Sequence, residues 1–239
     1  MSRKALLAIP LLAAGLTGAH AESSRVYEFT GFDRIEAQAG LRVAVQYSEK
    51  HHIEVIAKNS DLFDKIMITQ SGGSLVVKRK DDWSIIGLLS WDDNWTNDVQ
   101  VNITTPLLTE VEASSGASME IGPFDLDRLS LEATSGADLN ANDITVKSLS
   151  LDASSGASLD ATGACERLKA EASSGADINA QGVECAQGEI DVSSGADISA
   201  HLSTSVKADA SSGGSINITG SPKNVDIEQT FGGSINIKR

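Results

Sequence analysis

A row of acidic residues recurs along the second half of this chain at an almost constant interval. The seven acids, each two residues before a short Ser-Ser-Gly or related phrase, are Glu112, Glu132, Asp152, Glu171, Asp191, Asp209 and Glu228. If successive copies stack as parallel strands, neighbouring carboxylates lie about 4.8 Å apart and repel one another. The row therefore predicts either cation binding, such as weak calcium binding, or a solvated acidic face that keeps the sheet soluble.

Each acid belongs to a repeat that is built around a corner phrase. The first copy is Ser114-Ser115-Gly116-Ala117, and a degenerate copy, Thr230-Phe231-Gly232-Gly233, closes the series. The glycines of the seven copies stand at positions 116, 136, 156, 175, 195, 213 and 232. A period this short and steady is typical of a solenoid in which each repeat forms one coil.

Alternation within a repeat indicates strands on both sides of the corner. In 129–133 the apolar side chains alternate with Ser and Glu, and 137–141 continues the alternation after the turn at Gly136. The glycine supplies the positive φ that a sharp corner needs. A looser segment such as 144–146 closes the coil. The pattern predicts an all-β protein, a parallel β-helix with coils of about 19–20 residues.

Two further polar rows follow the corner. The first row consists of Ser118, Asp138, Ser158, Asp177, Asp197, Ser215 and Ser234, and the second of Glu120, Asn140, Asp160, Asn179, Ser199, Asn217 and Asn236. Such rows stabilise stacked strands through hydrogen bonds between coils. They could equally form a repetitive hydrogen-bonding surface for a glycan, and both interpretations stay open.

The two cysteines occupy the same place in adjacent repeats. Cys165 and Cys185 each stand eight residues before a corner serine, in a position that holds Leu126 and Val146 in earlier coils. Equal register on neighbouring strands brings their α-carbons within disulfide range. We predict a disulfide, and the alternative is a pair of small buried side chains.

All three tryptophans fall in one insert, residues 81–98. Trp83, Trp91 and Trp95 surround a short aliphatic run. The insert could pack as a lid over the helix, or it could present aromatic faces as a ligand-binding site. We expect the strands of 22–98, including this insert, to be continuous with the coils of 99–239 in one domain.

The first residues read as an export signal rather than as structure. Residues 1–21 combine Arg3 and Lys4, a short apolar run and an Ala-x-Ala cleavage pattern, which together predict a signal peptide. The protein is then periplasmic or secreted, and no later apolar run is long enough to form a transmembrane span. With 19 Lys and Arg against 33 Asp and Glu, the net charge of −14 argues against nucleic acid as a partner.

Several phrases resemble one bacterial family. Gly214-Ser215-Ile216-Asn217 and Gly233-Ser234-Ile235-Asn236 resemble the Gly-Ile-Asn signature of the head GIN domain family, as do 32–35 and 105–108. The resemblance covers roughly residues 29–239 and implies a right-handed parallel β-helix in an exported, adhesin-like protein. It implies no particular ligand.

These observations favour a non-enzymatic adhesin or envelope scaffold that binds a glycan or an envelope protein. No cofactor is expected. The alternative is a polysaccharide lyase or hydrolase that uses stacked carboxylates, but a row repeated in every coil lacks the unequal pair that acid–base chemistry needs. The open end after Ile237 leaves unpaired strand edges, which predicts a homo-oligomer or a docked partner there.

Overall fold

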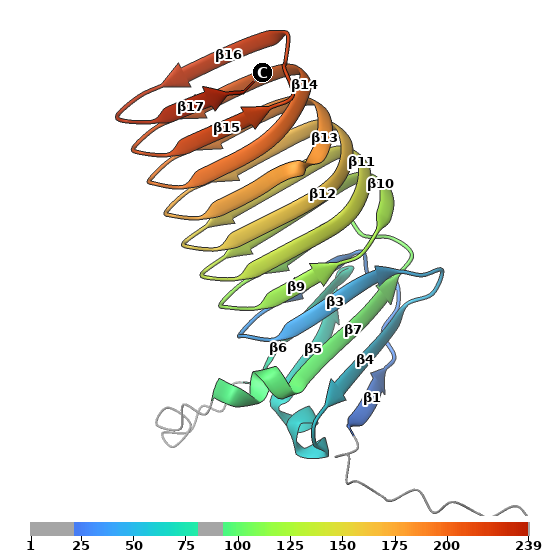
Figure 1. The fold of residues 1–239 in the computed structure, drawn as a ribbon. Helices are drawn as coiled ribbons and strands as arrows, with labels where there is room; N and C mark the ends of the chain where they lie inside the picture. Colours follow the sequence, from blue (N-terminus) through green and yellow to red (C-terminus); the bar gives the residue numbers. More distant parts are fainter. Residues whose placement is uncertain (1–21, 81–92, 239) are drawn as a thin grey trace, which may run out of the picture.

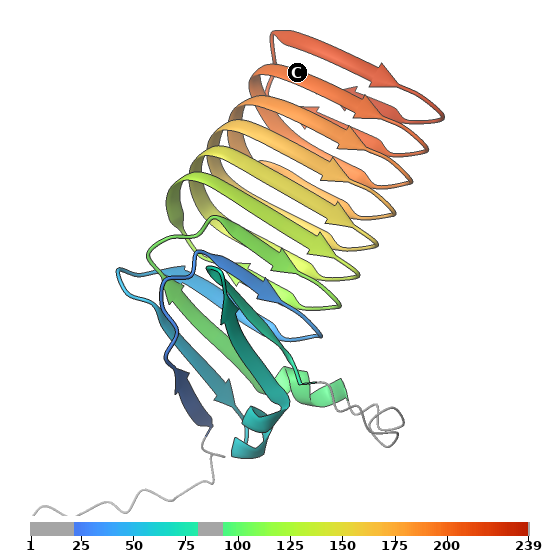
Figure 2. The same ribbon diagram turned by 180° about the vertical axis from the view of Figure 1, so that it is seen from behind.

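The computed structural model describes residues 22–80 and 93–238, and these residues form one 17-stranded sheet that winds into a β-solenoid of about six turns (Figure 1 and Figure 2). The predicted β-helix is thereby confirmed, while its right-handed winding stays a prediction. The predicted signal peptide, residues 1–21, and residues 81–92 of the insert lie outside the described residues.

The N-terminal part combines seven strands with two short 3-10 helices. In chain order these are β1 (Ser23–Tyr27), β2 (Arg34–Ala37), β3 (Arg42–Tyr47), β4 (His52–Ala57), η1 (Ser60–Lys65), β5 (Ile66–Ser71), β6 (Ser74–Arg79), η2 (Asp93–Asp98) and β7 (Val99–Thr105).

The solenoid coils follow, with long strands that bend from one side of the coil to the next. They are β8 (Glu110–Ala113), β9 (Ser118–Ile121), β10 (Phe124–Thr134), β11 (Asp138–Ser154), β12 (Ser158–Ala172), β13 (Asp177–Val192), β14 (Asp197–Ala210), β15 (Ser215–Thr219), β16 (Asn224–Gln229) and β17 (Ser234–Ile237). Neighbouring coils pair in parallel from β8 and β9 to β16 and β17.

Each coil has two long sides that meet at a corner. We call the side that precedes the corner the approach face; it comprises β8, the C-terminal parts of β10 to β14, and β16. The side that follows the corner is the exit face, with β9, the N-terminal parts of β11 to β14, β15 and β17. The approach face is turned towards the viewer in Figure 2 and the exit face in Figure 1.

The corners are tight turns in which two residues have positive φ. In the first, Ser115 has φ 53° and Gly116 has φ 73°, and the amide of Ala117 donates to the carbonyl of Ser114 at 3.1 Å. Two positive φ values with this hydrogen bond are typical of a type I′ turn. Gly116 also donates to Ser135 O of the next corner at 3.2 Å. The sequence pattern predicts a positive φ for the glycine only, but the serine before it has a positive φ as well.

The core lies between the two faces and is made of the inward residues of every coil. Rows such as Leu131, Leu151, Ala170, Ile190 and Ala208 are at most 1% exposed. Their strands alternate buried and exposed positions with period two. Since a shift of one residue would turn every apolar side chain outward, this alternation fixes the register between coils.

The N-terminal strands extend the solenoid and then depart from it. β2 and β3 stack in parallel on β8 and β9, and β6 and β7 stack on β2 and β3. Beyond them, β4 pairs antiparallel with β7 and β1, and β5 pairs antiparallel with β6. The parallel stack therefore ends in antiparallel strands at this end.

Candidate functional site

The acidic row is continuous along the approach face. All seven predicted carboxylates are register partners of their neighbours, in the order Glu112, Glu132, Asp152, Glu171, Asp191, Asp209 and Glu228. Glu36 of β2 pairs with Glu112 and adds an eighth member that the sequence reasoning missed. Its signal was the four-residue spacing between Glu36 and Gly40, which matches the spacing in the later copies. We call this set the acidic row.

Four carboxylates of the acidic row have raised pKa values. Partial burial, followed by repulsion from Glu36, raises the pKa of Glu112. Partial burial also raises the pKa values of Glu132, Asp152 and Asp191, each with repulsion from the next member of the row as the second cause. The predicted mutual repulsion of stacked carboxylates thus acts in the folded protein.

Lysines of the neighbouring row offset part of this repulsion. Lys169 Nζ lies 2.6 Å from Glu171 Oε1, and Lys207 Nζ lies 3.9 Å from Asp209 Oδ2 and 3.2 Å from Glu189 Oε1. All of these side chains are substantially exposed, so each pair stabilises the fold by little. In the described part of the chain, no group of three or more His, Cys, Asp or Glu side chains is arranged to hold a metal ion.

We expect Asp152→Asn to increase stability near neutral pH. Asp152 stands between Glu132 and Glu171, and removing its charge relieves two like-charge contacts at about 0.2–1 kcal/mol each. Because its pKa is raised in the folded state, the destabilisation it causes is absent below the ordinary pKa of 3.8 and grows as pH rises through the raised pKa. The gain should therefore be present at pH 7 and vanish below about pH 4.

Urea denaturation at pH 7 and at pH 3.5 measures this effect. Asp138→Asn is the matched control, since Asp138 has Ser118 and Ser158 as its register partners rather than acids. If both variants change the urea midpoint equally, repulsion within the acidic row does not influence stability.

The two polar rows also run without interruption, on the exit face. The first row keeps its register from Ser118 to Ser234 and the second from Glu120 to Asn236. Within the second row, Asn179 Nδ2 donates to Asp160 Oδ1 at 2.8 Å. All members of the two rows are exposed or half-exposed, so the face can both stabilise the stack and offer hydrogen bonds to a ligand.

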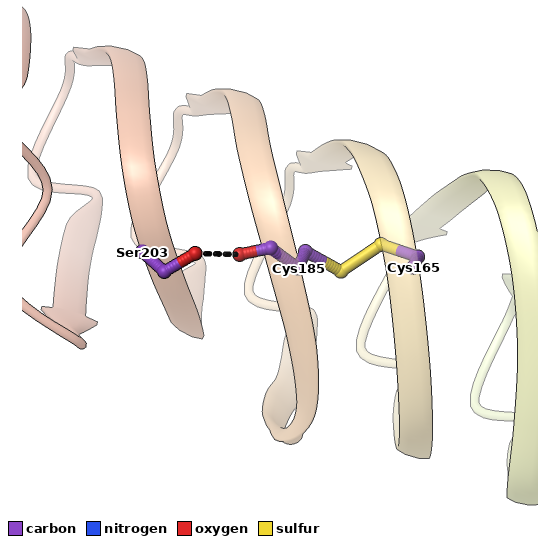
Figure 3. Close-up of a disulfide and its surroundings, with 3 residues drawn as sticks. All are labelled: Cys165, Cys185 and Ser203. Atoms are coloured by element: carbon purple, nitrogen blue, oxygen red, sulfur yellow. Dashed lines mark hydrogen bonds between the residues drawn. A yellow bond between two sulfur atoms is a disulfide. The ribbon is translucent and has the colours of Figure 1, made fainter.

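The predicted disulfide joins adjacent coils. Cys165 of β12 and Cys185 of β13 are register partners with α-carbons 4.5 Å apart, and their sulfurs are bonded (Figure 3). Their row continues from Val146 to Leu202, and Cys185 is 2% exposed. Ser203 Oγ donates to the carbonyl of Cys185 at 3.3 Å from the following coil. The bond thus lies in a row of core-facing side chains.

The tryptophan site stays a prediction. Trp83 and Trp91 lie outside the described residues, and Trp95 belongs to η2, the short helix that leads into β7. Across the ranges that the structure describes, no helix is long and apolar enough to cross a membrane.

The last coil exposes side chains that are buried elsewhere. Val225 and Ile227 of β16 are 40% and 47% exposed, whereas their partners Val206 and Ala208 in β14 are 3% and 0% exposed. The corner residue Phe231 is 89% exposed. Association through this end stays a prediction.

The fold and these surfaces define a β-solenoid with continuous polar rows on two faces. The family model described as "Putative auto-transporter adhesin, head GIN domain" matches residues 31–222. The chain belongs to this family, as the Gly-Ile-Asn phrases predicted.

Solved structures share the fold at low sequence identity. A "putative adhesin" from Bacteroides fragilis NCTC 9343 has a TM-score of 0.81 and 15% identity over 92% of this chain and 98% of that one. A "putative adhesin" from Parabacteroides merdae ATCC 43184 has a TM-score of 0.69 and 18% identity, over 91% and 96% of the two chains. A "putative lipid binding protein" from Parabacteroides distasonis ATCC 8503 has a TM-score of 0.68 and 17% identity, over 91% and 97%. None of the curated proteins matches this sequence significantly.

Proposed function

We propose that this protein is an exported, non-catalytic adhesin or envelope scaffold that binds glycan chains through repeated surface rows. The observation that carries the proposal is the unbroken register of the polar rows over seven strands of the exit face. A rigid surface that repeats about every 4.8 Å suits a polymer that also repeats, since weak contacts add along its length. Family membership and the disulfide support an extracytoplasmic location.

An enzymatic function has weaker support. Catalysis by two carboxylates requires environments that separate their pKa values, so that one acts as acid and the other as base or nucleophile. In the acidic row the four shifted pKa values all move upward, and burial is the leading cause for each. Such similar environments favour binding over acid–base chemistry.

Binding to a panel of envelope and host glycans tests the proposal. Purified protein without residues 1–21 is tested with and without calcium, beside a row variant, Asn140→Ala/Asn179→Ala, and the variant Trp83→Ala/Trp91→Ala/Trp95→Ala. We expect the wild type to bind one glycan class and the row variant to lose at least about fivefold in affinity, since each lost hydrogen bond costs about 1 kcal/mol.

The two variants separate the possible sites. Loss of binding only in the tryptophan variant would assign the site to the insert instead of the rows. Release of reducing ends or unsaturated sugars during incubation would favour the enzymatic alternative. No glycan binding by the folded wild type would overturn the proposed function.

A further inference from the structure

A groove on the approach face gathers positive charge in an otherwise acidic chain. It crosses the coils from β10 to β14, reaches β16, and has a volume of about 1050 Å³. Its charged lining consists of Arg128, Arg167, Lys169, Lys207, Lys223, Glu189 and Asp226. Cations therefore outnumber acids in this groove, whereas acids prevail in the whole chain.

The arginines of the groove stand in one register row. The row runs through Arg128, Ser148, Arg167, Gln187, Ser205 and Asn224. Arg128 and Arg167 are two coils apart, which places their α-carbons about 10 Å from each other. Arg167 Nη2 donates to Ser148 Oγ at 2.9 Å, and this bond holds the guanidinium along the row.

Three of the five cations keep most of their charge available to a ligand. Lys169 and Lys207 are engaged, with Glu171 and Glu189 as their closest acidic partners. The side chains of Arg128 and Lys223 make no hydrogen bond or ion pair with another described residue, although the backbone amide of Lys223 donates to the carbonyl of Thr204. Arg167 has only a loose ion pair, 3.7 Å from Glu166. The available cations are thus spread along the groove rather than clustered.

The rest of the lining suits sugar rings. Leu129, Leu149 and Leu168 lie beneath the groove and are 2% exposed, whereas Val225 presents apolar surface at the β16 end and is 40% exposed. Hydroxyl groups of Ser130 and Ser150 stand beside them in the lining. Apolar patches with a few placed polar groups are typical of small-molecule and sugar sites.

We propose that this groove binds a linear acidic glycan that runs along the solenoid axis, with carboxylates on alternating sugars. Arg128 and Arg167 take successive carboxylates two coils apart, and the serine hydroxyls bond to the neutral sugar between them. This inference rests on the proposed glycan binding, names the ligand class, and adds a site on the approach face that is separate from the polar rows of the exit face.

The neighbouring acidic row restricts which anions can enter. Glu132 and Asp152 follow Ser130 and Ser150 by two residues on the same face, so a ligand with charge on every unit would meet carboxylates as well as guanidinium groups. An anionic group that lies beside these carboxylates is repelled by them. A polymer with widely spaced charges and many hydroxyls avoids it, whereas polyphosphate does not.

Titration calorimetry with a hyaluronan hexasaccharide, which carries a carboxylate on every second sugar, tests the proposal. Neutral chitohexaose, polyphosphate and phosphatidylglycerol vesicles serve as comparison ligands. The test variant is Arg128→Gln/Arg167→Gln, and the control is Lys50→Gln/Lys80→Gln, which removes the same charge from other parts of the chain. We expect the test variant to lose about tenfold or more in affinity and the control less than twofold.

Equal binding by the two variants, or equal wild-type affinity for chitohexaose, would overturn the groove assignment. Binding to vesicles or polyphosphate in place of hyaluronan, with the same sensitivity to the arginines, would assign the groove to anionic lipid or phosphate instead. If other glycans bind and hyaluronan does not, this inference fails while the proposed function stands. If no glycan binds, both fail.

Discussion

Gly163→Ala should destabilise the protein by about 4 kcal/mol, since steric overlap and backbone strain add. Gly163 lies in β12 opposite Ile144 of the preceding coil, at a point where the register between the strands shifts. A Cβ at this position would lie 2.0 Å from the carbonyl oxygen and 2.6 Å from the amide nitrogen of Ile144, and both are backbone atoms that cannot rotate away. The φ of 133° is also one that side-chain-bearing residues rarely adopt.

Gly156→Ala is the matched control for this prediction. Gly156 has φ 70° in a corner, and a Cβ there would meet nothing within 4 Å. The substitution therefore carries only the cost of the left-handed conformation, about 1–2 kcal/mol. Urea denaturation of both variants, followed by circular dichroism, gives the comparison. Similar losses would show that β12 can move away from Ile144 and that the close approach is not required.

Repetition explains why so much of the solenoid could be predicted from the sequence. The acids, the corner glycines and the inward apolar residues recur together in each repeat. Because the strands alternate buried and exposed residues, only one register between neighbouring coils places each of these residues beside its counterpart. Position in the repeat also predicted the bond between Cys165 and Cys185, because equal places in adjacent coils become neighbours in space.

The N-terminal part of the chain was harder to predict, because its residues match the repeat less closely. The corner at Ala39 and Gly40 has the same two positive φ values as the later ones, but its residues depart from the Ser-Ser-Gly-Ala phrase. Glu36 was therefore not counted in the acidic row. The antiparallel strands β1, β4 and β5 are each used once, so no second copy could indicate their partners.

The basic groove was hidden for a different reason. Four of its five cations occupy two register rows in which they alternate with Ser, Gln and Glu, so no repeat position is consistently basic. Only the stacking of the coils shows that Arg128 and Arg167 lie in the same row and line the same groove. The two arginines stand two coils apart, so a search for residues that recur in every coil does not find them.

Loss of the Cys165–Cys185 bond should lower the free energy of unfolding by about 3 kcal/mol, because the bond closes a loop of 20 residues in the unfolded chain. The test variant is Cys165→Val/Cys185→Val, which keeps the row apolar in the way that Val146 does in the preceding coil. Packing is then largely retained, and the difference from the oxidised wild type reports the covalent bond. Chemical denaturation with and without dithiothreitol measures it.

The reductant separates the bond from the substitution. Dithiothreitol should bring the wild type to nearly the stability of the valine variant and leave that variant unchanged. In a solenoid each coil contacts its neighbours, so the loss should be concentrated at the junction of β12 and β13. Hydrogen exchange should therefore quicken in these two strands more than in β10 or β16. A valine variant as stable as the oxidised wild type would mean that stacking alone holds these coils together.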